Sequence, residues 1–193
     1  MKMTILFWAA VAAYAQAPEA PKQMNMAEMM AKAKRFTQPG EAHKPLERFL
    51  GDWTMDMRFM MGGKEGKPAM GDQRCTWLLK GRWIECRGQA PLMGSPSEMV
   101  TIIGYDNFKQ SYRVMMVSTI DTAMNISEGD LDRGGKTLLT YGTLDEYLTG
   151  EHDKMVKYVW RFDSPDAIRM EVHDLPIGET NTQVLHVRYT RKK

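Results

Sequence analysis

The sequence predicts an all-β protein, an antiparallel up-and-down barrel of about ten strands preceded by one or two short helices. Short segments of alternating apolar and polar residues recur after residue 50, and turn residues separate them. Such a meander closes economically into a barrel, because closure removes both exposed sheet edges. A two-sheet sandwich is the competing architecture, and strand spacing alone does not exclude it.

The N-terminus has the pattern of a secretory signal peptide. Lys2 provides a basic start, an apolar run follows to Ala13, and Ala13-Tyr14-Ala15 forms a cleavage signal. This run is shorter than the ~20 apolar residues that a membrane-spanning helix needs. We therefore expect cleavage of residues 1–15, no stable membrane insertion afterwards, and a periplasmic or extracellular mature protein.

The nearly equal numbers of positive and negative residues give no indication of a polyanionic partner. The chain has 26 Lys and Arg against 24 Asp and Glu, a formal net charge of +2. The basic residues near the C-terminus, Arg188, Arg191, Lys192 and Lys193, are typical of a solvated chain end rather than a phosphate site. No nucleic-acid partner is expected.

Two short helices are expected before the strands. Residues 16–38 form a leader in which Asn25 caps an amphipathic helix that ends before Pro39-Gly40. A second helix is expected from about Pro45 to Leu50, with Pro45 at its first position. Residues 39–193 then form the barrel domain.

The expected strands follow one another with tight turns between them. Their ranges are 52–61, 70–79, 82–90, 98–105, 110–118, 122–131, 136–144, 155–162, 167–174 and 182–190. The breaks carry turn residues, among them Gly62-Gly63, Lys80-Gly81 and Asp106-Asn107.

The first strand has one apolar face rich in methionine. Trp53, Met55, Met57, Phe59 and Met61 alternate with Thr54, Asp56 and Arg58. Methionine is unbranched and polarizable, so an interior lined by it adapts to varied ligands. We expect a small, largely apolar partner bound inside the barrel, and the predicted lining residues are Trp53, Met55, Met57, Phe59 and Met116. The alternative is that these are core fillers in a barrel with no ligand.

The two cysteines are placed to pair across a hairpin. A two-residue loop at Lys80-Gly81 sets Leu79 opposite Arg82 and Cys75 opposite Cys86. In a hydrogen-bonded pair the Cα atoms lie about 5.5 Å apart, which is within the disulfide range. We expect a disulfide in an exported protein. A reduced, packed pair is the alternative if export fails.

Residues 161–173 contain the candidate catalytic groups. Glu171 and His173 share a strand face, and an inward face would make them an acid/base pair with Arg161 as anion anchor. An outward face would make them a surface charge row. The chain contains no nucleophile elbow, phosphate loop, Rossmann glycine run or zinc motif. The sequence therefore favours a binding protein over an enzyme, and no cofactor is expected.

A methionine cluster precedes the barrel. Met24, Met26, Met29 and Met30 carry thioethers, which suit Cu(I). No His or Cys lies within that helix to complete a metal site. Copper handling is thus an alternative function, and packing of the helix over a barrel end is the structural interpretation.

The barrel segment resembles a bacterial lipocalin-like family of unknown function, from about Pro39 to Lys193. The motifs that carry the resemblance are His43-x-x-Leu46, Gly51-x-Trp53, Gly81-Arg82, Gly104-Tyr105-Asp106-Asn107, Ser118-x-x-Asp121-Thr122, Gly129-x-Leu131-Asp132, Arg161, Glu171 and Tyr189-Thr190-Arg191-Lys192. The resemblance implies a calycin-type barrel, often exported, with no established activity or catalytic residues. Because some related barrels bind haem through one histidine, it also implies His173 or His186 as a candidate axial ligand.

Overall fold

The computed structural model describes residues 25–61, 64–92, 94–146, 150–175 and 182–193. The expected signal peptide and Met24 lie outside these residues. The chain divides into two units, Met1–Lys34 and Arg35–Lys193. Helix α1 spans Met26–Thr37. The Asn25 Oδ1 accepts the Glu28 amide at 2.9 Å, so Asn25 caps this helix as expected.

The second unit contains a short 3₁₀ helix and the strands. The helix is η1 (Glu41–Phe49), and the strands are β1 (Gly51–Met61), β2 (Lys64–Glu65), β3 (Ala69–Leu79), β4 (Trp83–Leu92), β5 (Ser95–Asp106), β6 (Ser111–Ser118), β7 (Asn125–Leu131), β8 (Thr137–Glu146), β9 (Glu151–Ser164), β10 (Ala167–Asp174) and β11 (Thr182–Arg191). Within the described ranges, the two-residue β2 pairs only with the end of β1. The other ten form the predicted barrel.

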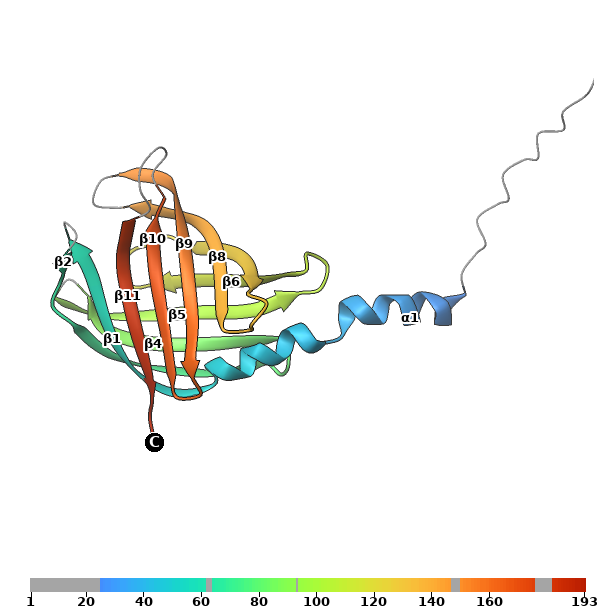
Figure 1. Ribbon diagram of the computed structural model, residues 1–193. Helices are drawn as coiled ribbons and strands as arrows, with labels where there is room; N and C mark the ends of the chain where they lie inside the picture. The colour runs from blue at the N-terminus through green and yellow to red at the C-terminus, as the bar shows by residue number, and fades with distance from the viewer. Residues whose placement is uncertain (1–24, 62–63, 93, 147–149, 176–181) are drawn as a thin grey trace, which may run out of the picture. The chain divides into compact units, whose positions relative to one another are not determined.

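Pairing between the first and last long strands closes the barrel. Successive strands are antiparallel neighbours from β3 to β11, and β1 pairs with both β3 and β11 (Figure 1). Met55 lies opposite Tyr189, and Met57 lies opposite Val187. This closure confirms the barrel and excludes the sandwich, whose two sheets would each keep free edges.

Helix η1 differs from the expected helix in type and start. It begins at Glu41, and Pro45 lies inside it rather than at its first position. The Gly40 amide donates to the Nδ1 of His43 at 3.1 Å, which starts the helix before the proline. Its buried side chains are His43, Leu46 and Phe49. The Phe49 ring meets Trp160 edge-on at 5.6 Å, so η1 packs into one end of the barrel.

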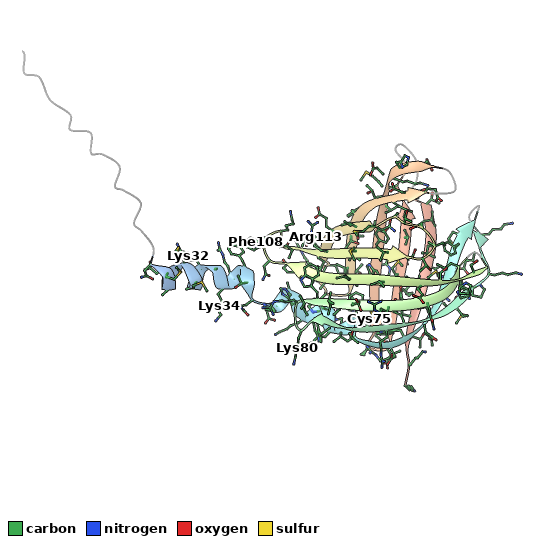
Figure 2. All side chains as sticks on the ribbon, turned by 180° about the vertical axis from the view of Figure 1, so that it is seen from behind. Lys32, Lys34, Cys75, Lys80, Phe108 and Arg113 are labelled. Atoms are coloured by element: carbon green, nitrogen blue, oxygen red, sulfur yellow. A yellow bond between two sulfur atoms is a disulfide. The ribbon has the colours of Figure 1, made fainter. Side chains whose placement is uncertain are left out.

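The cysteine hairpin confirms the predicted pairing and corrects the predicted turn. Cys75 lies opposite Cys86, and their sulfurs form a disulfide (Figure 2 labels Cys75). The loop is longer than expected, since Leu79 pairs with Trp83 and an irregularity between Trp77 and Leu79 restores the register.

Gly81 explains this longer turn. Its φ is +72°, and the Arg82 amide donates to the Leu79 carbonyl at 2.9 Å. A glycine at that position suits a β-turn with positive φ, so Arg82 belongs to the turn. The cysteine Cα atoms are 4.0 Å apart. That distance is closer to a non-hydrogen-bonded pair than to the expected hydrogen-bonded one.

Candidate ligand-binding interior

Burial along β1 shows which face points into the barrel. Trp53, Met55 and Met57 are 1%, 0% and 5% exposed. The residues between them, Thr54 and Asp56, keep more solvent contact. The apolar face that the sequence predicted therefore points inward, as strand alternation requires.

The end of the barrel next to η1 is closed and filled. The Trp53 Nε1 donates to the Phe49 carbonyl at 2.8 Å, which anchors the indole beneath η1. A cavity of about 10 Å³ lies here, and its lining residues are Phe49, Trp53, Gln73, Trp160, Ile168 and Tyr189. That volume suits a single water molecule rather than an organic ligand. Burial raises the pKa of Tyr189, as expected for a core phenol.

Met55 fills space in the same half of the barrel. A Cβ added to Gly71 would lie 3.0 Å from the Met55 methyl, and one added to Gly88 would lie 3.3 Å from it. Gly71 lies directly opposite Met55 on neighbouring β3, and Gly88 lies on β4. The absent Cβ atoms leave room for the Met55 methyl and, at Gly71, for the Gln89 carbonyl as well. In this part of the barrel, Met55 is a packed core residue, which was the alternative to a ligand-lining role.

At the opposite end of the barrel, some inward-facing side chains keep solvent contact. Inward-facing Phe59, Met116, Leu144 and Leu185 keep partial solvent exposure, although they point toward the barrel interior. An inward side chain contacts solvent only where solvent enters the barrel. Of the predicted lining residues, Phe59 and Met116 therefore lie at this open end, whereas Trp53 lies at the closed end.

An ion pair lies on the inner wall at the open end. The Lys154 Nζ is 2.9 Å from the Asp174 Oδ2, and the two side chains are 25% and 16% exposed. Lys154 shares its face of β9 with buried Val156 and Tyr158, and Asp174 lies opposite Val156. The hydrogen bond to Asp174 raises the pKa of Lys154. Burial raises the pKa of nearby Tyr158 to about 12.

Sequence reasoning missed both members of this pair. Lys154 lies one residue before the predicted strand 155–162, and Asp174 is the last residue of the strand 167–174. Polar residues at strand ends are usually solvated. Inward and outward residues alternate along a strand, so Lys154 shares a face with Val156, and Asp174 shares a face with Val172. Extending the alternation to these two residues would have placed both on the inner face.

The candidate catalytic residues come together on the outer face. Ile168, Met170 and Val172 are buried in the interior, so the intervening Glu171 and His173 point outward. The Glu171 carboxylate is 3.5 Å from the Arg161 Nε and 3.3 Å from the His173 Nε2.

The charge state of Glu171 fits a surface ion network. Burial favours its neutral form, but hydrogen bonds from His173 and Arg161 outweigh burial and lower the pKa of Glu171. Its carboxylate is therefore held in the charged form by these neighbours. The cluster corresponds to the surface charge row that the sequence left open.

Four of the residues singled out for metals lie on α1 and on the outer face of the barrel: Met26, Met29, Met30 and His186. His186 lies opposite Arg58 and Glu171 and shares their outer face, so neither His173 nor His186 points into the interior. Met26, Met29 and Met30 are exposed on α1. Among the described residues, no three His, Cys, Asp or Glu side chains group for a metal ion. No helix in that part of the chain is long and apolar enough to span a membrane.

Ten antiparallel strands that close on themselves, with a short helix filling one end, define a closed up-and-down β-barrel. Within that class, the chain belongs to the family described as "Protein of unknown function (DUF1579)", whose model matches residues 38–191. The match confirms the resemblance seen in the sequence motifs. No curated protein matches the chain.

Two solved structures show the same fold at low sequence identity. Rv2717c from M. tuberculosis is 12% identical with a TM-score of 0.59, and the match covers 81% of this chain and 100% of that one. The S-type phycobiliprotein lyase CPES from Guillardia theta is 10% identical with a TM-score of 0.57, covering 82% and 96%. These likenesses establish the barrel fold.

Proposed function

We propose that this chain is an exported binding protein that holds a small, largely apolar molecule in the open half of its barrel. One observation carries the proposal. At the end opposite η1, inward-facing Phe59, Leu144 and Leu185 keep partial solvent contact, whereas Leu46, Phe49 and Trp53 at the η1 end are buried. A barrel that is closed at one end and accessible at the other suits a ligand that enters end-on.

Apolar burial would supply most of the affinity. Phe59, Met116, Leu144, Val172 and Leu185 line the proposed site, and Met57 supports it from the filled half. Burying about 200 Å² of apolar ligand surface yields about 5 kcal/mol at ~25 cal/mol per Å². Flexible Met116 would adjust its shape to the occupant.

Two further observations support export and ligand handling. The Cys75–Cys86 disulfide suits an oxidising compartment, in agreement with the signal-peptide pattern at the N-terminus. The likeness of the fold to a phycobiliprotein lyase supports a ligand-handling role.

Ligand uptake tests this function directly. Protein purified from the exported fraction should carry an organic molecule visible by native mass spectrometry. After removal of that molecule, the folded protein should take up the neutral probe N-phenyl-1-naphthylamine saturably, at one probe per chain. Folded protein that carries no organic molecule and takes up no probe would overturn the proposal.

A further inference from the structure

The ion pair on the inner wall leaves one carboxylate oxygen unused. Lys154 binds the Oδ2 of Asp174. The Oδ1 of the same carboxylate is buried and has no hydrogen-bond partner among the described residues. A buried acceptor without a donor carries a free-energy penalty, which a donor from a ligand would relieve.

The register of β10 puts the Asp174 side chain next to the residues of the proposed site. Asp174 follows Val172 on the inner face of β10, and Val172 lies opposite Leu185. Lys154 lies opposite Leu144 on the neighbouring wall. The polar pair therefore adjoins the apolar lining, an arrangement that suits an amphipathic ligand rather than a purely apolar one.

The surrounding charges select the kind of polar group. Lys154 is shared between two carboxylates, since its Nζ is 2.9 Å from Asp174 and 3.4 Å from Glu151. A ligand carboxylate would have to displace one of them to reach the ammonium of Lys154. A ligand ammonium would instead donate to the unused Asp174 oxygen and gain a charge-assisted hydrogen bond.

We infer that the ligand of this barrel is an amphipathic amine, whose protonated nitrogen donates to Asp174 Oδ1 while its apolar part lies against Phe59, Leu144 and Leu185. This inference rests on the proposed function, because it assigns the polar end of the ligand in the same site. A neutral hydroxyl could donate to the same oxygen but lacks the charge. The expected order of affinity is ammonium, then hydroxyl, then carboxylate.

A matched series of ligands tests this order. Decylamine, 1-decanol and decanoate share one chain length and differ in the head group. Each would compete for the barrel with N-phenyl-1-naphthylamine at neutral pH, below its micelle concentration. We expect decylamine to bind about tenfold or more tightly than decanol, and decanoate to bind least tightly. The wild-type order is a test that needs no variant.

Three variants locate the effect. Asp174→Asn should remove the advantage of decylamine over decanol. Lys154→Gln frees the Asp174 carboxylate and should increase that advantage. Asp163→Asn, which changes an aspartate paired with Arg169 on the outer face, should leave the order unchanged. Thermal unfolding would confirm that each variant is folded.

The outcomes separate this inference from the proposed function. Equal affinity for the three compounds, or tightest binding of decanoate, would overturn the amine assignment while leaving interior binding intact. Failure of the folded protein to take up the naphthylamine probe would overturn both. Persistence of the decylamine advantage in folded Asp174→Asn would also contradict the assignment.

Discussion

The guanidinium of Arg191 lies 4.1 Å from the ring centroid of Trp53, so a cation–π contact joins the last strand of the barrel to the first. The same group donates to the Leu50 carbonyl at 2.6 Å and to the Pro165 carbonyl at 3.0 Å. Arg191 therefore connects the end of η1, the start of β1 and the turn before β10. It adds to the contacts of Trp53 and Phe49 that hold the closed end of the barrel together.

Replacing Arg191 should weaken the closed end. Arg191→Ala loses the ring contact and leaves backbone carbonyls without their donor, so we expect a loss of about 2–4 kcal/mol in the free energy of unfolding. Arg191→Lys should recover only part, because lysine lacks the planar fork of donors. Denaturant unfolding measures both, with exposed Arg188→Ala as a control on the same strand. Wild-type stability of Arg191→Ala would contradict this role.

The buried imidazole of His43 should make stability depend on pH. Burial lowers the pKa of His43 below 6.5, and its Nδ1 accepts the Gly40 amide as the neutral form allows. The unfolded chain therefore binds the proton more readily, and stability falls as pH drops below about 6.5. For a single proton, the free energy of unfolding changes by at most about 1.4 kcal/mol per pH unit.

The comparison with His43→Asn isolates that contribution. The asparagine oxygen can accept the Gly40 amide without titrating, so the variant should lose less stability than wild type between pH 7.5 and 5.5. Urea unfolding at both pH values gives the difference. Equal losses in the two proteins would show that His43 does not titrate as described.

The disulfide should contribute substantially to stability. It closes a loop of sequence separation 11, for which the chain-entropy relation gives about 3 kcal/mol. The double variant Cys75→Ala, Cys86→Ala should therefore unfold at a lower denaturant concentration than oxidised wild type. Dithiothreitol should lower the wild-type midpoint and leave the variant unchanged. A wild-type midpoint insensitive to complete reduction would contradict this prediction.

Local alternation predicted much of the fold. The inward face of β1 and the pairing of Cys75 with Cys86 depend on strand periodicity and short-range register, which the sequence displays directly. The predicted turn was one residue too short, because it left out Arg82. The irregularity between Trp77 and Leu79 compensates for this extra turn residue and keeps the cysteines paired. Such irregularities cannot be recognised from alternation alone.

The site depends on contacts that are distant in sequence. Arg191 is typical of a solvated terminus until β11 pairs with β1 and brings it over Trp53. Phe59 and Trp53 look equivalent on one strand face, and only the packing of η1 shows which of them lies at the closed end. The level of a side chain along the barrel is therefore a tertiary property that periodicity does not encode.

Neighbouring methionines on β6 provide the most direct test of binding inside the barrel. Met116 pairs with inward-facing Thr101, and Met115 lies opposite Ile126 on the outer face. Arg113, labelled in Figure 2, lies on the same strand face as Met115.

The measurement is fluorescence titration of folded Met116→Asp and Met115→Asp with N-phenyl-1-naphthylamine. Interior binding predicts at least about a tenfold loss of affinity for Met116→Asp and wild-type affinity for Met115→Asp. Equal affinities in the two variants, or loss only in Met115→Asp, would contradict it.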